Sequence, residues 1–260
     1  MKNLKALLIL ALLVFPVVSY VMADTTDEIF FKANQAYKNG NYKEAARLYT
    51  ELTETGHVSG HIFYNLGNTY FRLGDLGHTI LNYERAKLLI PRDEDLRFNL
   101  GYAKDRTRDA VEAPSRPLAA VFFWPDSFSL GELFAVFAII NALFFAALIL
   151  RLMHKREWTF IVLTTFIVIW LVSGSSLGVK WYQIVNDSRG VIIAGEVKVL
   201  AGPDPKDSEL FKLHVGTVVE IERMEGTWAL ISISEGKRGW MRRELIGFLS
   251  FDTGELPDKV

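Results

Sequence analysis

Residues 60–91, GHIFYNLGNTYFRLGDLGHTILNYERAKLLIP, are the clearest copy of a unit that recurs along the chain. Three tripeptides mark its fixed period: Lys32-Ala33-Asn34, Leu66-Gly67-Asn68 and Leu100-Gly101-Tyr102. The same offset aligns Gly40 with Gly74 and Tyr49 with Tyr83. A helical pattern surrounds a glycine-containing turn in each of the first two copies. One helical pair buries only one face, so about three copies must stack to form a stable fold.

This unit resembles the tetratricopeptide repeat, whose period is about 34 residues. The second copy carries the residues typical of that repeat, which are Leu66, Gly67, Tyr70, Gly74, Tyr83, Ala86 and Pro91. The first copy departs from the pattern at Lys32 and has no closing proline, and the third keeps only its first helix, as a capping helix would. We therefore expect an all-α stack of about 2.5 repeats over residues 27–110.

The resemblance implies a concave groove lined by the first helix of each repeat. Its lining would combine amide and aromatic side chains: Phe30, Asn34, Tyr37, Tyr64, Asn65, Asn68, Phe71, Phe98, Asn99 and Tyr102. Amides can donate to and accept from the backbone of an extended peptide, and aromatic rings add contact area. In the alternative interpretation, the asparagines only satisfy local backbone groups and the rings pack between helices.

Two further stretches are apolar and of membrane length. Residues 130–150 contain one charged residue, Glu132, and residues 158–179 contain none, and about 20 such residues cross a bilayer core of about 30 Å. Three basic residues lie in the short linker between them, and basic short loops stay in the cytoplasm. Residues 1–23, with Lys2 and Lys5 before an apolar run, are typical of an export signal, or alternatively of an uncleaved anchor. These features predict a protein with two membrane spans, in which both large domains face outward and the basic loop is cytoplasmic.

Small residues recur at a four-residue spacing in both stretches: Ala138, Ala142 and Ala146 in the first, and Gly174 and Gly178 in the second. Small residues at this spacing let helix backbones approach closely, so we expect them at the interface of a transmembrane hairpin. Asn141 falls near mid-membrane, at about the depth of Thr164 and Thr165. One amide without charged company favours a helix–helix hydrogen bond over a transport pathway.

From residue 190 the pattern changes to alternating, β-branched residues with turn residues between short runs. Five short strands in residues 190–249 predict a small barrel. The region resembles bacterial SH3-like domains in four segments: residues 197–203, residues 213–217, Gly226-Thr227-Trp228 and residues 236–240. Trp228 and Trp240 are its candidate ligand-binding residues, for a wall peptide or a proline-rich peptide, although both rings could instead serve packing.

Composition excludes several classes of function. The 29 basic and 30 acidic residues give a net charge of −1, without the basic excess that nucleic-acid binding needs. Because cysteine is absent, disulfides, thiolate metal sites and cysteine nucleophiles are excluded.

Residues 174–178, Gly-Ser-Ser-Leu-Gly, match a nucleophile elbow only formally, since they lie in a predicted membrane helix. Asp93, Glu94 and Asp95 are interpreted as helix-starting residues. We expect no enzymatic activity, cofactor or metal.

The order of an export signal, a tetratricopeptide stack, a two-helix transmembrane hairpin and an SH3-like barrel resembles the BatE family of the bacterial aerotolerance operon. That resemblance implies a scaffold that works with von Willebrand A-type membrane proteins and a MoxR-type ATPase in envelope stress or protein maturation. The leading hypothesis is therefore a non-enzymatic scaffold whose groove binds a partner segment. The second hypothesis is a cell-wall sensor whose barrel binds peptidoglycan.

Overall fold

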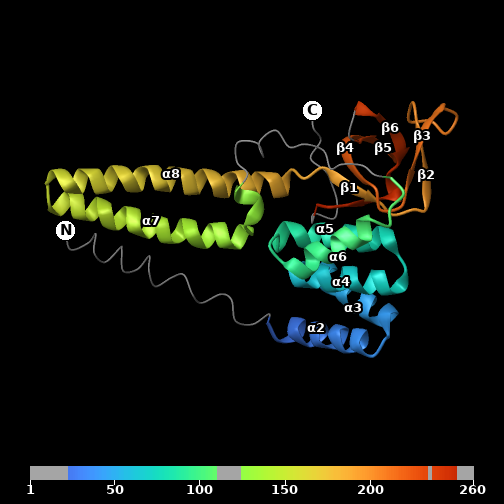
Figure 1. Ribbon diagram of the computed structural model, residues 1–260, viewed down its shortest axis with the longest axis horizontal. Helices are drawn as coiled ribbons and strands as arrows, with labels where there is room; N and C mark the ends of the chain where they lie inside the picture. Colours follow the sequence, from blue (N-terminus) through green and yellow to red (C-terminus); the bar gives the residue numbers. More distant parts are fainter. Residues whose placement is uncertain (1–22, 110–123, 234–235, 251–260) are drawn as a thin grey trace. The chain divides into compact units, whose positions relative to one another are not determined.

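The computed structural model describes residues 23–109, 124–233 and 236–250 (Figure 1). The expected export signal over residues 1–23 lies outside the described residues, except for Ala23. The chain divides into two units, residues 1–57 and 58–260. Each unit is treated by itself below.

The first unit contains a helical hairpin of α2 (Ala23–Lys38) and α3 (Tyr42–Glu54). Gly40 joins the two helices with a φ of 76°, a left-handed conformation that side chains disfavour. Ala33 and Tyr49 are buried between the helices. The Tyr49 hydroxyl donates a hydrogen bond of 2.7 Å to Oδ1 of Asn34.

The second unit begins with α4 (Gly60–Leu73), α5 (Leu76–Leu89) and α6 (Glu94–Lys104). Gly74 turns the chain between α4 and α5 with a φ of 79°, and the Tyr83 hydroxyl donates to Oδ1 of Asn68 at 2.6 Å. Both features also occur at the equivalent positions of the first unit, at Gly40 and between Tyr49 and Asn34. Asp93 accepts a hydrogen bond from the Leu96 N–H, which confirms its interpretation as a helix-starting residue.

The helices α7 (Leu130–Met153) and α8 (Glu157–Val185) form an antiparallel hairpin (Figure 1). Each is long and apolar enough to cross a membrane, which confirms the two apolar stretches. Only residues 154–156 separate the helices, so both extend closer to the turn than residues 150 and 158. A short 3-10 helix, η2 (Trp124–Ser127), contacts α8.

The α7–α8 interface differs from the expected one. Aromatic rings fill it, with Phe137 and Phe144 on α7 both packed against Trp170 on α8. The buried or half-buried positions on α7 follow one heptad face, whereas Ala138, Ala142 and Ala146 fall beside that face and are exposed. The alanine stripe is therefore not the packing surface.

Some of the other residues predicted at the α7–α8 interface contact the opposite helix, and others do not. A Cβ on Gly174 would lie 3.2 Å from the Phe137 ring, whereas a Cβ on Gly178 would meet nothing within 4 Å. Asn141 does make a bond between the helices, but its Oδ1 accepts from Nε1 of Trp170 at 3.0 Å. Thr164 and Thr165 instead donate to carbonyls of their own helix.

The segment after α8 is an antiparallel sheet, called the β-domain here (residues 189–250). Its strands are β1 (Arg189–Ile192), β2 (Glu196–Leu200), β3 (Glu209–His214), β4 (Val218–Glu225), β5 (Trp228–Ser232), β6 (Arg238–Arg242) and β7 (Ile246–Phe248). Their order in the sheet is β3-β2-β6-β5-β4-β1-β7. Five strands were expected and seven are found among the described residues. The edge strand β3 was missed because it buries only Leu213, and β7 because it has only three residues.

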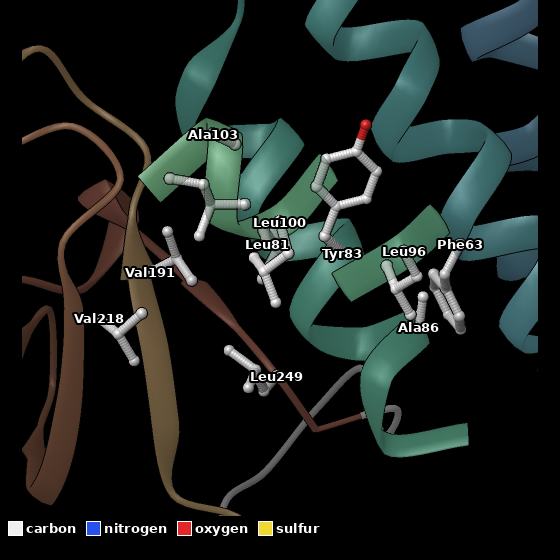
Figure 2. Close-up of a cluster of buried hydrophobic side chains, with 11 residues drawn as sticks. Phe63, Leu81, Tyr83, Ala86, Leu96, Leu100, Ala103, Val191, Val218 and Leu249 are labelled. Atoms are coloured by element: carbon white, nitrogen blue, oxygen red, sulfur yellow. The ribbon is translucent and has the colours of Figure 1, made fainter. Parts of the chain in front are cut away.

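Helix α5 packs directly against β1 and β7 (Figure 2). Leu81 of α5 shares one buried cluster with Val191, Val218 and Leu249 of the β-domain. The Leu81 side chain packs so closely on Gly247 that a Cβ there would lie 2.5 Å from Cδ2 of Leu81. The sequence did not predict this contact between segments on either side of the hairpin.

Polar contacts also join α5 to the β-domain. The Arg85 guanidinium donates from Nη2 to the Phe248 carbonyl at 2.7 Å, and burial lowers the pKa of Arg85 to about 10. Burial alone would raise the pKa of Glu84, but Lys104, at 2.5 Å, and Arg189, at 3.4 Å, hold that pKa below its ordinary value. Residues 60–109 and the β-domain therefore pack as one body.

Candidate functional site

Three aromatic rings and one guanidinium lie close together on α4, on α6 and just after the end of α6. This aromatic surface consists of Phe71, Phe98, Tyr102 and Arg106. The side chains of Phe98 and Tyr102 are 73% and 45% exposed, and their rings stack at 6.4 Å with an interplanar angle of 13°. The Cζ of Arg106 lies 3.5 Å from the centre of the Tyr102 ring. Exposed aromatic groups of this kind typically mark an interaction surface.

The aromatic surface is open because α6 has no partner equivalent to α5 among the described residues. In the second copy, Gly67 of α4 lies against Tyr83, so that an added Cβ would be 2.5 Å from its ring. A Cβ on Gly101, the equivalent position of the third copy, would meet nothing within 4 Å. Within residues 23–109, 124–233 and 236–250, no side chain covers the face of α6 at Gly101 as Tyr83 covers α4 at Gly67.

The predicted asparagines form a hydrogen-bond network next to this surface. Nδ2 of Asn99 donates to the Tyr64 hydroxyl at 2.9 Å and to Oδ1 of Asn68 at 3.2 Å. Oδ1 of Asn68 also accepts from the Tyr83 hydroxyl. Asn65 lies half-buried on α4, one turn before Thr69. Asn68 and Asn99 thus bond to tyrosine hydroxyls and to each other, and their binding of a peptide backbone stays a prediction.

The three groove residues predicted in the first unit make contacts within that unit. The Phe30 ring packs edge-on against Tyr49 at 6.1 Å. Asn34 accepts from Tyr49, and the Tyr37 ring packs edge-on against Tyr42 at 5.4 Å. Phe31 of the same helix is largely exposed. Asn34 therefore has the same structural partner as its equivalent Asn68 in the second unit.

A hollow of about 600 Å³ lies on the β-domain. It is lined by Ala201, Leu210, Glu222, Arg223, Leu230, Arg238, Gly239 and Trp240. Trp240 is only 6% exposed, and the Arg223 guanidinium lies over its ring at 5.2 Å. Trp228 does not line this hollow and instead packs under Arg242 at 4.4 Å. Leu210 was missed by sequence reasoning because β3 itself was not predicted. Arg223 and Arg238 lie on β4 and β6 and were missed because no local signal in the sequence places them beside Trp240.

Ser176, the centre of the formal elbow motif, has ordinary helix contacts. Its hydroxyl donates to the Val172 carbonyl at 2.8 Å and lies 2.9 Å from Nε1 of Trp124, which donates to it. Among the residues that the structure describes, no group of three or more histidine, aspartate or glutamate side chains is placed to hold a metal ion.

No protein-family model matches the chain, and no curated protein matches it significantly. Function is therefore inferred from the residues and their geometry.

Proposed function

We propose that this protein is a non-enzymatic scaffold, anchored in a membrane, whose aromatic surface binds a segment of a partner protein. The observation that carries the proposal is the exposed stack of Phe98 and Tyr102 under Arg106. Covering one such ring stabilises a complex by roughly 1.5–3 kcal/mol. Aromatic residues and arginine also dominate the binding energy of protein interfaces.

The hydrogen bonds beside the aromatic surface support a binding role for it. Asn99 and Asn68 tie α6 to α4 and, through Tyr83, to α5. A surface held in this way loses little conformational freedom when a partner binds, which favours affinity. The asparagines would then position the rings rather than contact the partner themselves.

The hairpin supplies the membrane anchor in this proposal. A turn of three residues returns the chain to the side from which it entered, so residues 23–109 and the β-domain share one side of the membrane. The turn contains Lys155 and Arg156, and Arg151 lies near the end of α7. This concentration of basic residues favours a cytoplasmic turn and periplasmic domains. Trp181 and Tyr182 are exposed near the opposite end of α8, where an aromatic belt is expected.

The resemblance to the BatE family extends the proposal to partners. In that interpretation, the helical hairpins are tetratricopeptide repeats and the β-domain is SH3-like. The glycine turn and the tyrosine–asparagine bond that recur in the first two copies support the first assignment. The partners would be von Willebrand A-type membrane proteins linked to a MoxR-type ATPase, in a complex of the bacterial inner membrane associated with envelope stress and aerotolerance.

Co-purification with substitutions tests the proposal. The tagged full-length chain is crosslinked in spheroplasts with a membrane-impermeant reagent, solubilised and compared with the double variant Phe98→Ala, Tyr102→Ala. The variant should recover at least about tenfold less of any specific partner, since two anchors at about 1 kcal/mol or more each are lost. The matched control is Val58→Ala with Leu73→Ala, which removes two other exposed apolar side chains. Equal recovery with both double variants contradicts the proposal.

The second candidate is a cell-wall sensor that binds peptidoglycan in the hollow of the β-domain. In that case, purified peptidoglycan should sediment the full-length protein, and Leu210→Ala with Arg238→Gln should abolish sedimentation. The aromatic-surface variant should sediment normally. Sedimentation that none of these substitutions changes counts against this candidate.

A further inference from the structure

The sheet of the β-domain has a second apolar face. Four residues form a row of cross-strand neighbours over β4, β5, β6 and β2: Arg223, Leu230, Trp240 and Leu200. Their sequence neighbours Ile231, Met241 and Val199 belong to the buried core cluster. Because side chains alternate between the faces of a strand, the row lies on the side opposite to the core. That side is the one hollowed at Trp240.

A β-bulge shapes this hollow. The register of β4 against β5 shifts between Ile221 and Arg223, which leaves Glu222 as the extra residue. A bulge changes the direction of the residue that follows, and here Arg223 pairs with Leu230 and lies over Trp240. Gly239, next to Trp240, also lines the hollow, and as a glycine it contributes only backbone to the lining.

The lining of the hollow combines apolar side chains with two arginines, Arg223 and Arg238, and one carboxylate, Glu222. Leu210 is 52% exposed and lines the hollow, so its side chain can contact a ligand there. Arg223 has an ion pair with Glu225 at 3.2 Å, whereas Arg238 has no ion pair within the described part of the chain. The hollow therefore offers an apolar wall beside a guanidinium that can bind an anion.

The position of Trp240 decides between two kinds of ligand. Sugar binding by a tryptophan generally uses an accessible ring face, but this ring is 6% exposed and lies beneath Arg223. An acidic peptide needs an apolar wall for a side chain and a guanidinium for a carboxylate, and both are present. The geometry thus favours a peptide over a glycan strand.

We infer that this hollow binds an acidic segment of a partner protein, with a large apolar side chain against Leu210 and Leu230 and a carboxylate on Arg238. This site is separate from the aromatic surface and does not depend on it. A scaffold with both sites would hold two segments, on one body formed by residues 60–109 and the β-domain.

Fluorescence anisotropy with the full-length protein in detergent tests this site. The probe is the fluorescein-labelled peptide Gly-Glu-Leu-Asp-Leu-Glu-Gly, and its neutral counterpart is Gly-Gln-Leu-Asn-Leu-Gln-Gly. We expect saturable binding of the acidic probe, and binding of the neutral probe that is at least about tenfold weaker, since a charge-assisted hydrogen bond is lost. Arg238→Gln should lower the affinity for the acidic probe by about tenfold, and Leu210→Ala should lower the affinity for both probes.

The matched control is Lys237→Gln, which removes the same charge at the neighbouring position outside the hollow and should leave binding unchanged. The Phe98→Ala, Tyr102→Ala variant should also bind the probe normally, which separates this test from that of the aromatic surface. No saturable binding, equal binding of the two probes, or equal effects of Arg238→Gln and Lys237→Gln would overturn the inference. Peptidoglycan sedimentation that Arg238→Gln abolishes but the acidic probe does not inhibit would assign the hollow to the cell wall instead.

Discussion

Tyr83 occupies a position that leaves no room for a side chain at residue 67. Its ring is buried against α4 and its hydroxyl is bonded to Asn68. We predict that Gly67→Leu lowers the free energy of unfolding of the helical part by about 1–3 kcal/mol or more, because an overpacked side chain must displace the ring. Chemical denaturation followed by circular dichroism in detergent measures this change.

The matched control is Gly101→Leu, at the equivalent position of the next copy. A Cβ there meets nothing within 4 Å, so this variant should unfold close to the wild-type midpoint. Equal destabilisation by both substitutions would contradict the prediction, because it would show that contact with Tyr83 does not set the cost at residue 67.

Asp109 links the end of the helical part to the β-domain through one carboxylate. It accepts from the Thr217 hydroxyl at 2.6 Å and from the His214 N–H at 2.7 Å. Burial would raise the pKa of Asp109, but these hydrogen bonds outweigh burial and lower it. A lowered pKa means that the carboxylate stabilises the fold above the unfolded pKa of about 3.9, and that this contribution is lost as the pH falls below it.

We therefore predict that Asp109→Asn lowers the midpoint of thermal unfolding at pH 7, and that the difference from wild type shrinks between about pH 4 and pH 3. Tryptophan fluorescence in detergent follows the transition. A difference that stays constant over that range would show that the charge of Asp109 contributes nothing to the interface.

At the scale of residues, the sequence predicted turns and helix caps, but it did not predict contacts between residues far apart in the chain. Gly74 and Asp93 have recognisable turn and capping chemistry in the sequence around them. The bond between Asp109 and Thr217 joins residues 108 positions apart. Neither residue carries a local signal for the other, so only the folded chain reveals the pair.

Among the elements, α5 is unusual because other elements pack against it on two sides. Nine of its residues are buried, including Asn82 and Glu84, which is typical of a helix enclosed by other elements rather than of one at a surface. One side contacts α4 and the other contacts β1 and β7. The β-domain thus covers apolar surface that would otherwise face solvent.

We predict that Gly247→Leu separates the β-domain from α5, because a Cβ there already lies 2.5 Å from Cδ2 of Leu81. Trypsin should then cut at Lys87 and Arg97 about tenfold faster or more in the full-length protein, as the loss of about 1.4 kcal/mol or more implies. Peptide mass spectrometry over time measures the rates. The control is Gly195→Leu, where a Cβ meets nothing within 4 Å. Equal rates in both variants would contradict the docking of α5.

The hairpin shows how far a pattern predicts an element. Length and hydropathy predicted both helices, because an apolar segment needs about 20 residues to cross the bilayer core. The packing face was predicted wrongly at Ala138, Ala142 and Ala146. A small-residue spacing indicates close approach only where no bulky side chain intervenes, and here Phe137, Phe144 and Trp170 fill the interface.

At the scale of the whole molecule, orientation in the membrane remains a prediction. The chain has no cysteine, so single cysteines can report on it without background. We predict that cysteine at Lys43 or Lys206 reacts with a membrane-impermeant maleimide on spheroplasts, and that cysteine at Lys155 reacts only after lysis. The reverse pattern would place both large domains in the cytoplasm and contradict the proposed topology.

Site-specific photo-crosslinking in intact cells tests the central claim, that the aromatic surface binds a partner. A benzophenone amino acid replaces Phe98 in the full-length chain, and a second strain carries it in place of Leu73, an exposed residue outside the aromatic surface. We predict a discrete adduct with a membrane protein from position 98 and none from position 73. No adduct at position 98, or the same adducts from both positions, would contradict the account.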